Sequence, residues 1–313
     1  MPSQVSARSA FRPLHYIAYI LLCGIWGSTW LAIRVLVRDV PPLRGAGMRF
    51  VLAAALLALG AAARRTRFPQ SRREWRAVAI LSVTMMAVPY GLLFWGEQYV
   101  TSSMTAVLYS LSPLTVALLT PFTTQHRVPE RAIVCMLVGV AGVGLLFAHS
   151  LAGSRSTLLG GLAVLGAMVI SAWSAIFAKK EAATLDPMLS TCLQLVLGAV
   201  LLLPASFLAE AGRPSMWTRS AVLAVLFLAV AGSAVAFAVY YWLLKHMFPY
   251  QLSTISLIVP IIAMLEGGLA LHEPISLPMI GAAALVLVAV AAVLRAEGSG
   301  EVILREQQTT SDT

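Results

Sequence analysis

The sequence predicts an all-α membrane protein with ten transmembrane helices arranged as two five-helix inverted repeats. The first observation is composition, because 59% of the 313 residues are hydrophobic and 11% are charged, whereas about 25% of a soluble domain is charged. The second is a mean hydropathy of +0.85. The third is a similarity between the two halves of the chain. The first two observations exclude a water-soluble globular protein.

Apolar runs separated by turn residues and charges predict the individual helices. A membrane-spanning helix requires about 20 predominantly apolar residues, so a chain of this length has room for about ten. The predicted spans are 16–37, 46–63, 77–97, 103–122, 131–148, 158–178, 188–208, 219–243, 250–271 and 276–295.

The distribution of Lys and Arg predicts that both termini are cytoplasmic. If the N-terminus is inside, the cytoplasmic segments hold 15 Lys and Arg and the outer segments hold 6, and cytoplasmic loops collect these residues. The loop from Arg64 to Arg76 supplies six of the 15. This bias explains much of the net charge of +9, so we expect no nucleic-acid partner. The first apolar run lacks a clean cleavage site and is interpreted as a retained helix rather than a signal peptide.

The two halves resemble each other at a nearly constant shift, which indicates an internal duplication. A shift of 147 residues superimposes Trp26 on Trp173, Trp95 on Trp242 and Pro113 on Pro260, and a shift of 145 superimposes MRFVLAAALL on LQLVLGAVLL. Because each unit contains five spans, an odd number, the second copy enters the membrane from the opposite side. Inverted repeats are typical of secondary transporters that bind substrate between the repeats.

The duplication predicts four parts of the chain. They are a cytoplasmic tail (1–15), a first repeat (16–150), a second repeat (151–295) and a C-terminal tail (296–313). The last part is rich in Glu, Gln, Ser and Thr, which is a composition typical of disorder.

Several short motifs carry a resemblance to a known family. They are CGIWGSTWLAIRV and DVPPLRGAGMRF in the first two spans, SLSPLTVAL in the fourth, LIVPIIAML in the ninth and the closing LHEP. In this order and spacing, the chain resembles the EamA-type family of the drug/metabolite transporter superfamily over about residues 16–295, as two tandem units.

The resemblance implies a basket-shaped transporter of ten helices with a central cavity, usually an exporter of small metabolites or amino acids, in the inner (plasma) membrane of a bacterium. A Gly-Glu pair is common in the family after the fourth and ninth spans. This chain has Gln125-His126 and His272-Glu273 at these two places. We therefore assign no role from the family to these residues.

Aromatic and hydroxyl residues recur at helical spacing in the presumed core spans. Such walls suit an amphipathic solute, because flat rings bind its apolar part while hydroxyls orient its polar end. The alternative is helix packing or an interfacial aromatic belt. The candidate substrate-binding residues are Trp26, Ser28, Thr29, Tyr90, Phe94, Trp173, Phe237 and Tyr241.

Three ionisable residues are candidates for coupling or for the transport pathway, because charges inside a bilayer are costly and tend to mark pathways. Glu266 is roughly 9 Å from the outer end of the ninth span at about 1.5 Å per residue, so it faces a wet cavity, pairs with an Arg or stays protonated. Glu97 lies at the outer mouth of the third span, where solvation is the alternative. Arg49 either extends toward the headgroups or attracts a carboxylate substrate.

Pro113 and Pro260 lie near the centres of the fourth and ninth spans and are related by the repeat. Each removes a backbone hydrogen bond and bends its helix. We interpret them as matched hinges or kinks that shape the cavity, with tolerated membrane prolines as the alternative.

Enzyme and cofactor signatures are missing from the sequence. There is no GxxxxGK[ST] loop and no HExxH motif, and the three aspartates (Asp39, Asp186 and Asp312) are too scattered for a metal-diphosphate site. The cysteines (Cys23, Cys135 and Cys192) form no metal or disulfide pattern. We therefore expect neither an enzyme nor a cofactor. Without an ATP site, uphill transport must use an ion gradient or exchange.

The sequence as a whole predicts a secondary transporter that exports a small amphipathic metabolite or amino acid by alternating access, with proton coupling through Glu266. The alternatives are an importer, a membrane ligand-binding protein of the same fold and a membrane enzyme. The expected partners are a small-molecule substrate and the lipid bilayer. The oligomeric state, including a monomer, is left open.

Overall fold

The computed structural model describes residues 13–100, 102–123, 128–146, 155–271, 277, 280–281 and 284–293, and all regular secondary structure in them is helical. The predicted tail 296–313 and most of the tail 1–15 lie outside the described residues. The pairs Gln125-His126 and His272-Glu273 lie outside them as well.

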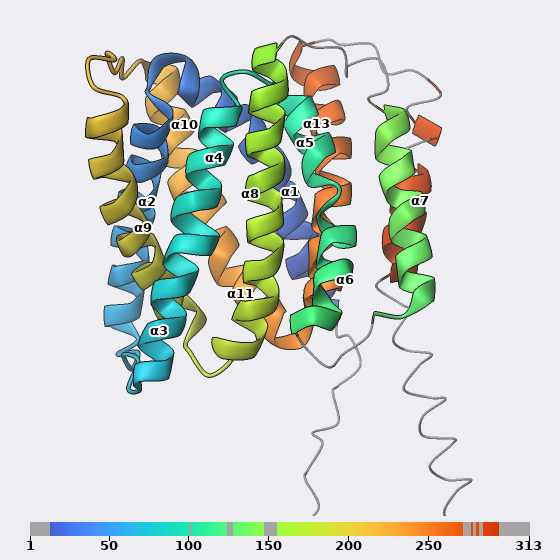
Figure 1. Cartoon of the computed structure of the whole chain (residues 1–313), viewed down its shortest axis with the longest axis horizontal. Coiled ribbons are helices and arrows are strands. Elements are labelled where there is room, and N and C mark those ends of the chain that lie inside the picture. The colour runs from blue at the N-terminus through green and yellow to red at the C-terminus, as the bar shows by residue number, and fades with distance from the viewer. Residues whose placement is uncertain are drawn as a thin grey trace, which may run out of the picture.

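The helices stand side by side in one bundle (Figure 1). In chain order they are α1 (Pro13–Asp39), α2 (Pro42–Ala63), α3 (Arg72–Leu81), the π-helix η1 (Ser82–Ala87), α4 (Val88–Gly96), α5 (Ser102–Tyr109), α6 (Ser112–Thr123), α7 (Glu130–Leu146), α8 (Arg155–Glu181), α9 (Pro187–Ala209), α10 (Arg219–Ala229), the π-helix η3 (Val230–Val235), α11 (Ala236–His246), α12 (Pro249–Ser253) and α13 (Ile255–Leu271). A further apolar helix covers Ala284–Val293.

Among the described residues, six helices are long and apolar enough to cross a membrane. The remaining apolar helices are shorter, although each of the ten predicted stretches contains helix. The prediction of an all-helical chain with several membrane spans is therefore confirmed. The count of ten crossings and the cytoplasmic position of both termini stay predictions.

Two long helices are interrupted by π-helical segments, which the sequence did not predict. The third predicted span is α3, η1 and α4 in continuous succession, and the eighth is α10, η3 and α11. In a π-helix the amide bonds to the carbonyl five residues back, and the segment is frequently found at functional sites.

The two repeat-related prolines occupy different positions in their spans. The fourth span is broken at Ser110 and Leu111, and Pro113 is the second residue of α6 after that break. The ninth is broken at Thr254, while Pro260 lies inside the continuous helix α13. The two prolines thus occupy different helical positions, and their interpretation as matched hinges or kinks stays a prediction.

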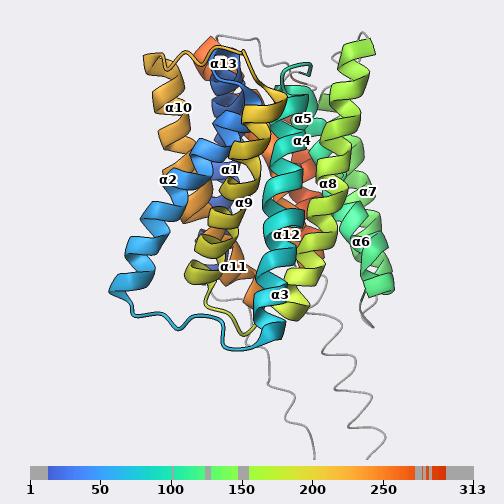
Figure 2. The same ribbon diagram turned by 60° about the vertical axis from the view of Figure 1, so that its left-hand side comes forward.

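Helix packing follows the proposed inverted repeat. Helix α1 packs against α10, α11 and α13, which belong to the eighth and ninth spans. Its repeat counterpart α8 packs against α4 and α6, which belong to the third and fourth spans. The repeat makes these two pairs of spans equivalent. Helices α2 and α9, the second span of each repeat, pack along each other (Figure 2). The polar core of the bundle lies where these two sets of helices meet.

Two glycines allow α4 and α8 to approach closely. A Cβ atom on Gly160 would lie 2.9 Å from the carbonyl oxygen of Gly96, and one on Gly96 would lie 2.8 Å from that of Gly160. No real side chain fits at such distances. Small residues at helix crossings are typical of membrane bundles, and this contact fixes one wall of the site described next.

Candidate functional site

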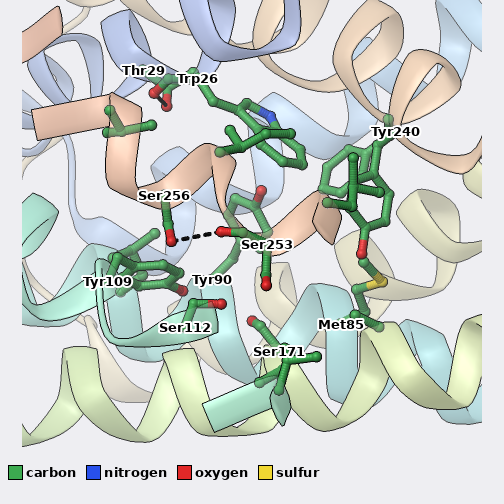
Figure 3. Close-up of a pocket in the computed structure, with 18 of the residues that line it drawn as sticks. Trp26, Thr29, Met85, Tyr90, Tyr109, Ser112, Ser171, Tyr240, Ser253 and Ser256 are labelled. Atoms are coloured by element: carbon green, nitrogen blue, oxygen red, sulfur yellow. Dashed lines mark hydrogen bonds between the residues drawn. The ribbon is translucent and has the colours of Figure 1, made fainter. Parts of the chain in front are cut away.

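An internal cavity of about 150 Å³ lies among helices of both repeats (Figure 3). A water molecule occupies roughly 30 Å³ in the liquid, so the cavity has room for a small organic molecule. Six aromatic residues line it, namely Trp26, Trp30, Tyr90, Tyr109, Phe237 and Tyr240. Its hydroxyl residues are Thr29, Ser112, Ser171, Ser253 and Ser256.

Four of these aromatic residues, Trp26, Tyr90, Phe237 and Tyr240, form a connected wall. The Trp26 ring lies 5.9 Å from the ring of Phe237 and 5.4 Å from that of Tyr240. The rings of Tyr90 and Phe237 are 6.2 Å apart. These centroid distances are typical of favourable aromatic pairs. The wall therefore holds itself in place and presents an apolar surface to the cavity.

Arg49 is the one charged residue among the described residues that line the cavity. Its side chain is 1% exposed. Its Nε donates to the hydroxyl of Ser233 at 2.6 Å and its Nη2 to the carbonyl of Gly232 at 2.8 Å. Its Cζ lies 4.8 Å from the centre of the Tyr90 ring, a cation–π distance. Tertiary contacts thus hold this cation inside the bundle, so the snorkelling alternative is wrong.

The π-helical segment η3 explains why a carbonyl is available to Arg49. Where a chain leaves the π-helical pattern for the α-helical one, one carbonyl is passed over by the amides. The amide of Ala236 bonds to the carbonyls of Ala231 and Ser233, and so it skips Gly232. A buried carbonyl needs a donor, and Arg49 supplies it.

Three donors on cavity-lining residues are buried and have no partner. They are the indole Nε1 of Trp26, the indole Nε1 of Trp30 and Nη1 of Arg49. Leaving a buried polar group unsatisfied typically costs about 1–3 kcal/mol, and more for a charged group. All three are donors, so a ligand that satisfies them must offer acceptors.

The structure brings five predicted site residues together at the cavity and places the others outside its lining. The five are Trp26, Thr29, Arg49, Tyr90 and Phe237, and the others are Ser28, Phe94, Trp173, Tyr241, Glu97 and Glu266.

Glu266 lies beside α1 rather than in the cavity lining. The hydroxyl of Ser28 donates to its Oε1, and its Oε2 is buried without a partner. Among the described residues, no Arg side chain forms an ion pair with it. Glu266 is thus a largely enclosed carboxyl group that contacts the helix carrying Trp26.

Glu97 is 0% exposed, so the alternative of a solvated carboxylate is wrong. Both of its carboxyl oxygens are buried without hydrogen-bond partners. Arg34 donates to the backbone carbonyls of Glu97 and Val100. The Glu97 carboxyl group is therefore enclosed near Arg34 without a direct hydrogen-bond partner of its own.

The other predicted aromatic residues make contacts outside the cavity lining. Phe94 is fully buried 6.3 Å from the Tyr90 ring. Trp173 stacks on Phe177 at 5.1 Å. Tyr241 donates to Gln194 at 2.7 Å, so it is part of a different polar cluster.

Sequence reasoning missed Tyr240 and Gln194. It assigned the eighth span's cavity face to Phe237 and Tyr241 four residues apart, whereas Phe237 and Tyr240 three residues apart line the cavity. Gln194 could have been found from the sequence, because the 145-residue shift aligns it with Arg49. Within the described part of the chain, no group of three His, Cys, Asp or Glu side chains could hold a metal ion.

Comparison with known proteins agrees with this architecture. The model of the EamA-like transporter family matches residues 14–148 and 158–295. The uncharacterized transporter YoaV of Bacillus subtilis is 30% identical over 263 residues, which cover 84% of this chain and 90% of that protein. The uncharacterized inner membrane transporter YedA of Escherichia coli is 26% identical, with 80% of each chain covered.

Protein PagO of Salmonella typhimurium is 26% identical and covers 79% of this chain and 82% of its own. A solved crystal structure that is 20% identical matches the fold with a TM-score of 0.73, over 90% of this chain and 96% of that one. With two matches to one family model that together span nearly all described helices, the chain belongs to the EamA-like transporter family.

Proposed function

We propose that the protein is a secondary transporter that exports a small amphipathic carboxylate, amino acids included, by alternating access. Family membership supplies the general transporter role. The observation that carries the proposal is the set of three unpartnered donors, Nη1 of Arg49 and the indoles of Trp26 and Trp30, around one largely apolar cavity.

A carboxylate matches these donors. Hydrogen bonds between a guanidinium and a carboxylate are charge-assisted and are roughly twice as strong as neutral ones. The low dielectric of a buried site strengthens them further. The apolar part of the substrate packs against Phe237 and Tyr240, while Arg49 and the indoles hold its charged end.

Alternating access requires the cavity to open to either side as the repeats move. The cavity lies between helices of the two repeats, and substrate sites of inverted-repeat transporters lie at that interface, typically at interrupted helices. Both π-helical segments border this region, because Arg49 contacts η3 and Met85 of η1 lines the cavity. We propose that the bundle rearranges at these segments.

Proton coupling through Glu266 is the second part of the proposal. Its carboxyl group contacts Ser28, two residues from Trp26 on α1. Protonation of Glu266 and binding of substrate at Trp26 therefore act on the same helix. This shared helix gives a physical route from the proton to the substrate.

The test uses protein reconstituted into inside-out vesicles with an imposed pH gradient. The labelled probes are phenylacetate, phenylacetamide and phenethylamine, which share an apolar body and differ in charge. We expect gradient-dependent uptake of phenylacetate above that of protein-free vesicles, and little uptake of the other two.

Three outcomes contradict parts of the proposal. If no carboxylate is transported but one of them raises the melting temperature, the protein binds a ligand without transporting it. A ligand that binds the folded state stabilises that state, so the thermal shift reports binding. Gradient-driven accumulation of phenylacetate only in right-side-out vesicles identifies an importer. Preferred flux of phenethylamine contradicts the carboxylate.

A further inference from the structure

We propose that a hollow between α3 and α8 binds the headgroup of an anionic phospholipid. The hollow has a volume of about 480 Å³, and the two helices pack against each other. It lies at the end of the bundle where α3 begins and α8 ends, the lower end in Figure 1. This headgroup site is lined by Arg72, Arg73, Arg76, Ala77, Phe177 and Glu181. The proposal is independent of the proposed transport function.

The headgroup site carries a net positive charge, because three arginines line it and Glu181 is the one carboxylate in its lining. The Nε of Arg73 pairs with Glu181 at 2.7 Å, and this ion pair joins α3 to α8. Arg72 and Arg76 are exposed, and within the described part of the chain neither side chain has an ion pair or hydrogen bond. Two guanidinium groups are therefore available to an anion, and their planar forks match the oxygens of a phosphate.

The position of the arginines in α3 is unfavourable for the helix itself. The helix begins at Arg72, so all three arginines lie at the end where the helix dipole is positive. The acidic residue of this first turn, Glu74, accepts the backbone amides of Gln70 and Ser71. A charge bias between the two sides of a membrane requires basic residues in a loop rather than in a helical turn. A bound anion would offset this local cost.

The exposed face of the helix changes from charged to apolar along its length. Spacings of four, three and four residues define one stripe on a helix, and its exposed members are Arg72, Arg76, Ala79 and Val83. Trp75, in the same turn as the arginines, is 45% exposed, and tryptophan is enriched at the level of the lipid headgroups. A phospholipid has the same order of groups, with an anionic headgroup followed by acyl chains. A soluble phosphate would use the charged part alone.

The number of available guanidinium groups predicts an order of lipid affinity. Basic pockets between membrane helices bind headgroups such as that of cardiolipin. Cardiolipin has two phosphates and offers one to each of Arg72 and Arg76. We expect it to bind more tightly than phosphatidylglycerol, which has one phosphate, and zwitterionic phosphatidylethanolamine should bind least.

The test measures lipid binding to the full chain in detergent, by melting temperature and by native mass spectrometry. The probes are the three lipids named above and inorganic phosphate. The double variant Arg72→Gln/Arg76→Gln removes two charges from the headgroup site. Its matched control, Arg64→Gln/Arg67→Gln, removes two charges from the same basic segment, at exposed positions outside the lining.

We expect cardiolipin to raise the melting temperature, because a ligand of the folded state stabilises it. Its Kd should rise on the order of tenfold in the Arg72→Gln/Arg76→Gln variant and stay within about twofold in the control. Glu181→Gln should tighten the binding, because it removes the one carboxylate of the lining and frees Arg73. A gain of affinity cannot result from misfolding.

Three results overturn the proposal. An equal loss of cardiolipin binding in both double variants assigns the binding to the general charge of the segment. Phosphatidylethanolamine that binds as tightly as cardiolipin removes the role of the anionic headgroup. Stabilisation by inorganic phosphate equal to that by cardiolipin identifies a site for a soluble anion instead of a lipid.

Discussion

The third and eighth spans, which the internal repeat makes equivalent, are interrupted in the same way but stabilised by different side chains. The π-helical segments begin at Ser82 and Val230, 148 residues apart. In the first, the hydroxyl of Ser174 lies 2.8 Å from the carbonyl of Thr84. In the second, Arg49 donates to the carbonyl of Gly232 at 2.8 Å. Thr84 and Gly232 are also 148 residues apart.

Each of the two carbonyls is left for an outside donor, and the reason differs between the two spans. In the third span the amide of Val88 bonds to Val83, and the next residue, Pro89, has no amide hydrogen to offer. The Thr84 carbonyl is therefore left to Ser174, whose hydroxyl is shared with the carbonyl of Ile170 in its own helix. In the eighth span the amides pass over Gly232 instead.

The difference teaches that the repeats share backbone geometry and differ in charge. A neutral hydroxyl is sufficient to satisfy the carbonyl in one repeat, so the guanidinium in the other exceeds that structural need. Three charged residues inside the bundle have apolar or neutral repeat counterparts: Arg49 aligns with Gln194, Glu97 with Leu244 and Glu266 with Leu119. We infer that these charges serve substrate and coupling rather than folding.

The largest expected effect comes from replacing Arg49 with glutamine, the residue type at the equivalent position of the second repeat, Gln194. Arg49→Gln should lower kcat/KM for phenylacetate on the order of 100-fold, because hydrogen bonds to charged groups contribute about 1.5–3 kcal/mol. Arg49→Lys should have an intermediate effect, because a lysine keeps the charge but not the planar fork. Vesicle uptake measures both.

Phenylacetamide is the control substrate for Arg49. Its binding should change little, because it has no charge for Arg49 to recognise. An equal loss of binding for both compounds would assign Arg49 to folding alone, and would remove the functional meaning of the difference between the repeats.

Glu266→Gln should have the next largest effect, on coupling rather than on binding. The amide accepts a hydrogen bond from Ser28 as the carboxyl does but cannot release a proton. We expect the dependence of uptake on the pH gradient to disappear while downhill exchange of phenylacetate continues. Unchanged gradient-driven uptake in this variant would contradict the proton role.

Ser174→Ala should destabilise the protein by about 1–3 kcal/mol, because it leaves the Thr84 carbonyl, which is part-buried, without its side-chain donor. The combined variant with Pro89→Ala offers a sharper test, since it returns an amide hydrogen to the turn that lacks one. We expect part of the lost stability to return, as measured by unfolding in detergent.

The exposed Ser220→Ala serves as a control for Ser174 and should leave stability nearly unchanged. Strictly additive effects of Ser174→Ala and Pro89→Ala would show that the two residues do not act on the same carbonyl.

The smallest expected effect is that of Tyr241→Phe in the second repeat's neutral cluster. It removes one hydrogen bond to Gln194, which typically contributes about 1 kcal/mol. We expect a slightly less stable protein, as measured by unfolding in detergent. Stability equal to that of the unmodified protein would argue against a contribution of this hydrogen bond.

Much of the fold could be predicted because apolar runs of suitable length have few alternatives in a bilayer. The predicted spans all contain helix, and the aromatic stripe of Trp26, Tyr90 and Phe237 does line the cavity. The π-helical segments could not be predicted, because one inserted residue changes backbone hydrogen bonding without changing hydrophobicity. The structure places Tyr240 rather than Tyr241 in the cavity lining, and helical spacing alone is compatible with either residue.

The sequence by itself determined that this chain is helical and membrane-embedded, that it is duplicated, and that few charges are available for function. Composition and periodicity decide these properties, because the properties depend on the transfer of many side chains from water to an apolar environment. They do not depend on contacts between particular residues. Only the tertiary structure decided which charged side chains are enclosed and what they contact, because burial and partners come from other helices. It alone placed Arg49 against Gly232 and Tyr90 and removed Glu97 from water.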